Sequence, residues 1–232
     1  KRTGLLITLG AGLVLLVVLA FTVGPILYRD LIVGPAASTP QEELSAQAGP
    51  GAGGDLELGA GEWVLGEGSF AGYRVAEVLN GTDVTVTGRT ESVSGRVTTS
   101  DTAVTAATIE VDVASIATDS SSRDSYFREQ ALDTATHPTA SFVLDGTIAP
   151  DPVPGPGETI DLPVAGSLTL NGVTREITAE LTTALTDAGV TVAGQIPVTF
   201  ADYGVTAPDL GFVRVDDQGF IEFSLTLVRA AG

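Results

Sequence analysis

The chain has 232 residues, 29 of them acidic and 11 basic, and a net charge of −18 at pH 7. It contains no cysteine and a single histidine, which excludes disulfides, cysteine-based redox or metal chemistry, and metal sites built from several histidines. Such an acidic chain repels phosphate groups, so we expect no nucleic acid partner.

The first predicted element is a membrane anchor over residues 1–30. Gly4 to Tyr28 are 25 consecutive residues without a charge, which as a helix would reach about 37 Å and span a bilayer core of about 30 Å. A cleaved signal peptide is the alternative, but its apolar region is normally about 7–15 residues long. Lys1 and Arg2 precede the run, and the positive-inside rule places that end in the cytoplasm. We therefore predict a single pass through the cell membrane, with the remainder on the extracytoplasmic side.

Residues 31–60 are predicted to form a flexible linker. The stretch 34–60 is rich in Gly, Ala, Pro and Ser and has no apolar periodicity, a composition typical of a tether. The predicted folded domain therefore spans 61–232. Because it carries 24 acidic residues against 8 Arg and no Lys, we expect it to stand off anionic lipid head groups.

Alternation of apolar and polar residues predicts an all-β domain. Successive segments show the period of two residues that a half-buried strand requires, and turn residues such as Asn80-Gly81 separate them. This arrangement is typical of an antiparallel sandwich or barrel. The predicted strands are 84–88, 108–116, 140–146, 167–170 with its partner 173–181, 190–200 and 219–228.

The segment 120–135 breaks this pattern and predicts a short helix set against the sheet or across its end. Its residues are compatible with a helix, and Ser121-x-x-Asp124 resembles a capping box in a looser form. His137 precedes Pro138, and a residue before proline is pushed out of the helical region. We expect the helix to stop there.

Asn171-Gly172 is the strongest hairpin signal in the chain, because both residues of a two-residue turn take positive φ. Such a turn pairs Leu170 with Val173 and Leu168 with Arg175. Arg175 would then share an apolar face, where a charge is costly unless it is paired or reaches water. Either it lies near a barrel mouth or on a bulge and turns to solvent, or it anchors the polar head of a ligand.

Five stretches, in order, resemble the YceI family. After an opening Trp63 they are SFAGYRV (69–75), EVDVASIATDSSSRD (110–124), DTATHPTASF (133–142), GSLTLNGVTREIT (166–178) and TFADYGV (199–205). The resemblance covers roughly 61–230. It implies a lipocalin-like antiparallel β-barrel that holds a polyisoprenoid, or a quinone or lipid with such a tail. The predicted anchor departs from the cleaved signal peptide of simpler members, so this barrel would exchange lipid only at its own membrane.

The interior of such a barrel is either just filled by side chains or holds one slim ligand, and composition leaves both open. If it is hollow, enclosing prenyl units favours binding through apolar burial alone. The residues we expect to face the ligand are Phe70, Tyr73, Val111, Val113, Phe127, Phe142, Leu168, Leu170, Phe200 and Phe223, with Arg175 at the head group.

Other candidate chemistry is weak. His137 before Pro138 favours a loop or packing role over catalysis, and the acidic run 215–222 lacks the ligand spacing of a calcium loop, which favours a solvated turn at 216–219. Arg123 and Asp124 match a pair in the family, and such a pair caps a helix start or contacts a ligand head. We predict no metal and no enzymatic activity.

Two functions follow. The first is a membrane-tethered module that shelters an isoprenoid lipid, with no cofactor beyond that lipid or quinone. The second is a non-enzymatic accessory protein whose barrel is filled by its own side chains and whose anchor docks it to a larger membrane complex. Small residues in the anchor would let another helix approach. They are Gly4, Gly10, Ala11, Gly12, Ala20 and Gly24.

Overall fold

The computed structural model describes residues 36–48, 59–150, 155, 157–186 and 189–230. Within these ranges no helix has both the length and the apolar character needed to cross a membrane. The predicted anchor over 1–30 lies outside the described residues, as do residues 31–35 and 49–58 of the predicted linker.

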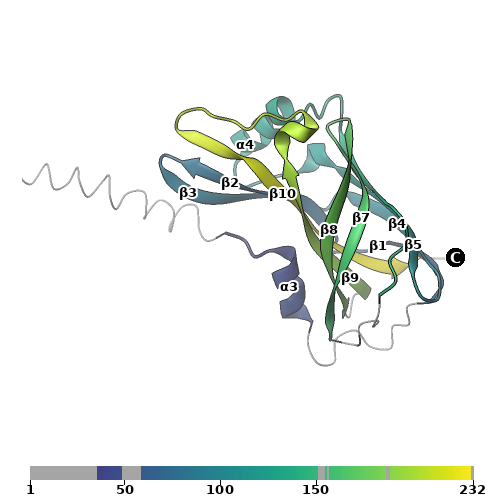
Figure 1. Ribbon diagram of the computed structural model, residues 1–232. Helices are drawn as coiled ribbons and strands as arrows, with labels where there is room; N and C mark the ends of the chain where they lie inside the picture. The colour runs from purple at the N-terminus through teal and green to yellow at the C-terminus, as the bar shows by residue number, and fades with distance from the viewer. Residues whose placement is uncertain (1–35, 49–58, 151–154, 156, 187–188, 231–232) are drawn as a thin grey trace, which may run out of the picture.

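The described residues form ten strands of one antiparallel sheet (Figure 1). Their order is β1-β4-β5-β6-β7-β8-β9-β10-β2-β3, and β1 also pairs with β10. This last pairing closes β1 and β4 to β10 into a barrel, which confirms the antiparallel β-barrel of the predicted fold class. The strands are β1 (Gly61–Leu65), β2 (Phe70–Leu79), β3 (Thr82–Thr90), β4 (Val93–Thr99), β5 (Val104–Asp112), β6 (Thr139–Leu144), β7 (Thr159–Leu170), β8 (Val173–Thr186), β9 (Gly189–Thr199) and β10 (Val213–Arg229).

β10 has 17 residues and pairs with two different strands along one of its edges. Residues from Leu227 onward pair with β1, whereas residues up to Ser224 pair with β2. β1 and β2 therefore follow one another along β10, and β4 and β3 are their respective partners. β4 continues the ring by pairing with β5, but β3 forms no such ladder with the chain after β5: among the described residues they share the isolated bridge Arg89↔Ala117 and a side-chain hydrogen bond between Thr90 and Ser115. At the β2–β3 end the barrel wall therefore parts.

A short helical segment lies at this gap. α4 (Ser121–Tyr126) continues into the π-helix η3 (Phe127–Ala131). The Phe127 ring stacks on Tyr73 of β2 with centroids 4.9 Å apart. The helix predicted for 120–135 is thus present, and its side chains join the barrel wall.

Both ends of this helix differ from the prediction. Ser120, rather than Ser121, is the N-cap, because its Oγ accepts a hydrogen bond from the backbone N–H of Arg123. The helix ends at Ala131 because Leu132 turns to an extended conformation and buries its side chain in the core. His137 and Pro138 come after a further turn and do not end it.

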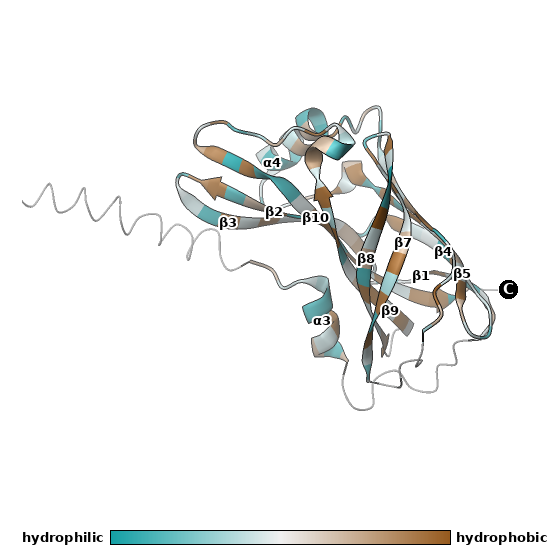
Figure 2. Cartoon of the chain, viewed as in Figure 1, coloured by the Kyte–Doolittle hydropathy of each residue, from teal (hydrophilic) through white to brown (hydrophobic). Residues whose placement is uncertain are grey.

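The predicted hairpin is confirmed in turn type and register. Asn171 and Gly172 both have positive φ, 51° and 73°, and Leu168 pairs with Arg175. The predicted turn at 216–219 is wrong, because β10 runs through it as a strand. β9 continues to pair with β10 at 218 and 219, so the extra residues form an irregularity in the β10–β2 pairing instead of a reversal. Figure 2 shows the alternation of apolar and polar residues along the strands.

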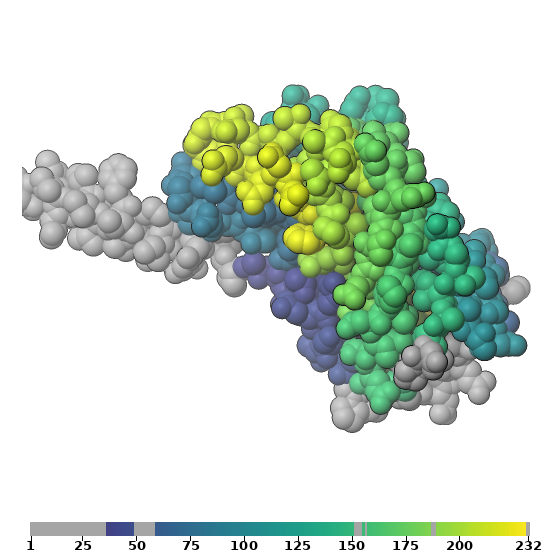
Figure 3. Space-filling view, viewed as in Figure 1, coloured from purple at the N-terminus to yellow at the C-terminus, as the bar shows by residue number. Residues whose placement is uncertain are grey.

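A helix lies within the segment predicted to be flexible. In α3 (Pro40–Gln47) the side chain of Thr39 accepts from the backbone N–H of Glu42, and Glu42 accepts from that of Thr39, which makes a capping box. Leu44 is only 2% exposed and packs on Ala184 and Ala193, so that α3 lies on the outer wall of the barrel (Figure 3). The flexible-linker prediction is therefore wrong for 36–48.

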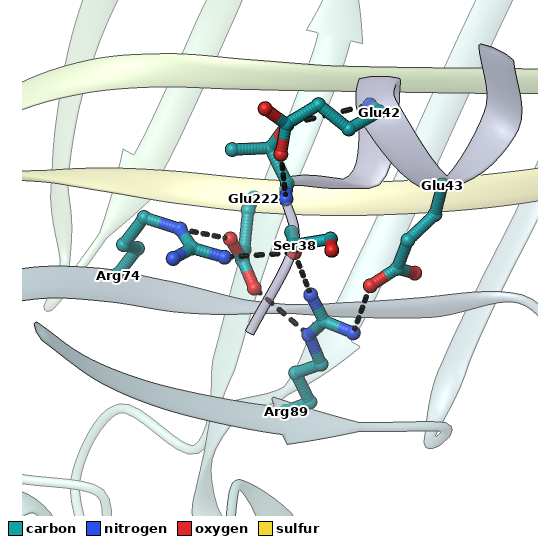
Figure 4. Close-up of polar contacts among 7 residues, drawn as sticks. Ser38, Glu42, Glu43, Arg74, Arg89 and Glu222 are labelled. Carbon is teal, nitrogen blue, oxygen red and sulfur yellow. Dashed lines mark hydrogen bonds and ion pairs between the residues drawn. The ribbon is translucent and has the colours of Figure 1, made fainter. Parts of the chain in front are cut away.

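An ion cluster joins this segment to the sheet (Figure 4). The carboxylate of Glu222 on β10 is fully buried and lies 2.8 Å from the Nε atoms of both Arg74 and Arg89. Each guanidinium group also donates to the carbonyl oxygen of Ser38, and Arg89 contacts Glu43 at 3.3 Å. Arg74 and Glu222 occupy outward positions of their strands, so the cluster lies outside the barrel interior.

At the β1 end, buried residues of three other strands, β4, β8 and β9, pack around Trp63 of β1. Trp63 is 1% exposed, and its Nε1–H donates to Oγ1 of Thr99 at 2.9 Å. Burial of an indole requires such a partner for its N–H. The cluster gives the barrel a dense apolar core at this end.

Candidate ligand-binding cavity

The barrel interior contains a cavity of about 660 Å³ that opens to solvent, within the range of about 300–1,000 Å³ typical of ligand sites. Side chains of β2, β4 to β10, α4 and η3 line it, and nearly all are apolar. The barrel is therefore hollow, and the alternative in which its own side chains fill it is wrong.

The cavity exists because many inward positions carry small side chains. Ala71, Val97, Ala107, Ala140 and Val164 all line it, on five different strands. In a barrel closed by eight strands, residues of this size leave space that larger ones would fill.

Most of the predicted ligand-facing residues lie on the cavity wall. Those on strands point inward because side chains alternate between the two faces of a sheet, and the helical segment contributes to the same wall. Their contact with a ligand stays a prediction. The lining includes Tyr73, Val111, Val113, Phe127, Phe142, Leu168, Leu170, Phe200 and Phe223.

Two predicted residues do not line the cavity. Phe70 lies an odd number of positions from Tyr73 on β2, so the two cannot share a face, and the Phe70 ring instead lies 4.4 Å from the guanidinium of Arg89. Arg175 is exposed and donates from Nε to the carbonyl oxygen of Asp202 at 3.1 Å. Because it lies close to the hairpin turn, its side chain extends to solvent.

Two cavity-lining residues that sequence analysis missed lie on the loop before β10. Leu210 and Phe212 are 55% and 58% exposed and also border the cavity. The sequence did indicate an exposed apolar site here, because apolar residues in a short loop beside Pro208 and Gly211 cannot reach the core.

The polar groups of the lining gather near α4. Glu77 from β2 and Arg123 from α4 both face the cavity, and Arg123 Nε lies 3.8 Å from Glu77 Oε2. Burial raises the pKa of Glu77, and the Arg123 charge opposes that shift. Burial also raises the pKa of Tyr73 to about 12, so its hydroxyl stays protonated at neutral pH.

The neighbouring Asp124 has a structural role. Its Oδ1 accepts from the backbone N–H and the hydroxyl of Thr118, at 2.9 and 2.7 Å, which ties the start of α4 to the preceding loop. Of the predicted Arg123–Asp124 pair, Arg123 alone lines the cavity.

His137 packs beside the β7–β8 turn, where a Cβ added to Gly172 would come within 2.6 Å of its ring. Across the described parts of the chain, no group of three or more His, Cys, Asp or Glu is placed to hold a metal ion.

These features define an antiparallel β-barrel with an apolar internal cavity. A YceI-like domain model matches residues 64–227, and the chain belongs to this family. Among solved structures, a polyisoprenoid binding domain from Saccharophagus degradans implicated in plant cell wall breakdown is similar in fold. It has a TM-score of 0.58 and 20% identity, over 74% of this chain and 99% of that one.

BcnA of Burkholderia cenocepacia is also similar, with a TM-score of 0.52 and 25% identity, over 67% of this chain and 96% of that one. Comparison with curated proteins finds no match.

Proposed function

We propose that this protein is a membrane-tethered lipid-binding module that holds a polyisoprenoid, or a quinone-like lipid with an isoprenoid tail, inside its barrel. The observation that carries the proposal is the apolar cavity of about 660 Å³. Burial of apolar surface contributes about 25 cal/mol per Å², so a prenyl tail would bind without polar contacts. Family membership and the polyisoprenoid binding of the Saccharophagus degradans domain support this ligand class.

The apolar run Gly4–Tyr28 and the preceding Lys1 and Arg2 support a tether that leaves the barrel on the extracytoplasmic side. Exposed Leu210 and Phe212 at the border of the cavity support an entry route for an apolar ligand. The module is proposed to carry its ligand without chemical change, since an almost wholly apolar lining favours binding over catalysis.

The test is to purify the full chain, extract it with organic solvent and identify bound lipids by mass spectrometry. We expect a prenyl lipid in the extract, and a rise in melting temperature when geranylgeraniol is added to delipidated protein. An extract without prenyl lipid, together with an unchanged melting temperature, contradicts the proposal.

Matched variants locate the binding. Val164 is buried and lines the cavity, whereas Val143 is exposed on β6. Val164→Phe should fill part of the cavity and abolish the stabilisation by geranylgeraniol, and Val143→Phe should retain it. Equal stabilisation of both variants would place the ligand elsewhere.

A further inference from the structure

The polar end of the cavity contains a buried carboxylate whose presence the fold does not explain. Glu77 occupies an inward position of β2 between Val75 and Leu79, which both line the cavity. Its side chain is 6% exposed, and no group among the described residues donates a hydrogen bond to it. Burying a carboxylate is costly unless it is paired and hydrogen-bonded, and an apolar residue would avoid that cost.

Arg123 satisfies Glu77 only in part. The distance of 3.8 Å between Arg123 Nε and Glu77 Oε2 is too long for a hydrogen bond. The Nη1 atom of Arg123 is instead engaged by Asp119, at 2.6 Å from its Oδ1. One guanidinium group is thus shared by the buried Glu77 and by Asp119, whose side chain is 73% exposed outside the cavity, so Arg123 compensates the charge of Glu77 only in part.

This arrangement has a consequence for the ligand. A phosphate or diphosphate head would bring further negative charge next to Glu77, and like charges at close range are strongly unfavourable. A hydroxyl group carries no charge and supplies the hydrogen-bond donor that Glu77 lacks. The Tyr73 hydroxyl lies within the electrostatic influence of Glu77 and Arg123, and it adds a further neutral polar group.

We propose that Glu77 is the head-group site of the cavity: it accepts a hydrogen bond from the hydroxyl of an uncharged isoprenoid lipid, such as a polyprenol or a quinol, and excludes anionic prenyl phosphates. The inference rests on the proposed function and deepens it, since it names the chemical class of the head group. Arg123 acts as a positioning residue that holds the Glu77 carboxylate at the cavity surface.

The test uses three ligands with one tail: geranylgeraniol, its methyl ether and geranylgeranyl phosphate. The full chain in non-ionic detergent is equilibrated with equal amounts of all three, and native mass spectrometry counts the bound species. For the wild type we expect the alcohol to predominate over both the ether and the phosphate.

Two variants and a control isolate the contribution of Glu77. Glu77→Gln keeps the shape and removes the charge, so the ratio of alcohol to phosphate should fall by about tenfold. Glu77→Leu removes the acceptor, so the preference for alcohol over methyl ether should disappear. Glu180→Gln makes the same charge change at an exposed position of β8 and should leave both ratios unchanged. Because the detergent is the same for every protein, unequal partition of the ligands into micelles cancels when the ratios of the variants are compared with that of the wild type.

The outcomes separate the two proposals. If the wild type and Glu77→Gln give the same ratios while all three ligands bind, the head-group site is overturned and the lipid-binding function stands. If no ligand binds to the wild type, the lipid-binding function itself is contradicted. Binding of the methyl ether by each variant shows that its cavity is intact.

Discussion

Arg74 on β2 and Glu222 on β10 form an ion pair of 2.8 Å on the outer face of the barrel. Arg89 on β3 contacts the second carboxylate oxygen at the same distance, and Glu222 is fully buried beneath the segment that precedes the barrel. The carboxylate of Glu222 therefore joins three strands, β2, β3 and β10, and the two arginines connect them to the N-terminal segment.

Glu222→Gln should lower the free energy of unfolding by about 3–5 kcal/mol, because removing one partner leaves buried charge uncompensated. Urea denaturation measures the loss. The control is Glu62→Gln, which breaks the exposed pair between Glu62 and Arg96 and should cost less than about 1 kcal/mol. Equal losses would mean that burial of the cluster contributes nothing.

Leu44→Ser should detach α3 from the barrel. Leu44 is the buried contact of this helix with Ala184 and Ala193, and a helix of eight residues is not stable in isolation. We expect faster hydrogen exchange of the amides of 41–47, with little change in the exchange of β7 and β8. Ala46→Ser, at an exposed position of the same helix, should exchange like the wild type.

The ionisation of Glu77 should make stability depend on pH. Burial raises the pKa of Glu77, the charge of Arg123 lowers it, and the charge of Asp119 raises it further. The folded state therefore binds the proton more tightly than the unfolded state. The associated stability is fully present below the unfolded pKa and is lost as pH rises through the folded pKa.

Glu77→Gln, which cannot ionise, should therefore gain stability relative to the wild type as pH rises from about 4 to about 8. Urea denaturation at each pH gives the difference in the free energy of unfolding. A constant difference would show that Glu77 titrates alike in the folded and unfolded states.

Gly172→Ala should destabilise the β7–β8 hairpin for two separable reasons. A φ of 73° costs an L-residue about 1–2 kcal/mol, and the new Cβ would collide with the His137 ring. His137→Ala removes the collision but leaves the backbone cost. In the double variant the loss due to Gly172→Ala should shrink to the backbone part, and thermal unfolding of the four proteins measures this coupling.

The predictions from sequence that the structure confirms rest mainly on local patterns, namely turn geometry and strand alternation. The Asn171-Gly172 turn fixes the register of β7 and β8 by geometry alone, and the family resemblance supplied the closed barrel. Alternation also places Glu77 inward beside Tyr73, and the same rule shows why the prediction for Phe70 was wrong. The capping box of Thr39 and Glu42 is also a local pattern, but the linker prediction rests on composition alone, which does not reveal such a box.

The remaining features depend on closure of the sheet. The ion cluster unites Ser38, Arg74, Arg89 and Glu222, which are far apart in sequence, and no local pattern indicates that they meet. The cavity volume follows from how far opposite walls stand apart, which side-chain size alone does not set. Residues 216–219 have turn-forming composition, yet β10 runs through them as a strand, in which 218 and 219 pair with β9.

The guanidinium groups of Arg74 and Arg89 both donate to the carbonyl oxygen of Ser38, and these contacts would transmit a pulling force from the N-terminal segment to the barrel. Tension on the chain ahead of Ser38 would pass through these contacts to Arg74 in the middle of β2 and to Arg89 near the end of β3, and from both to Glu222 on β10.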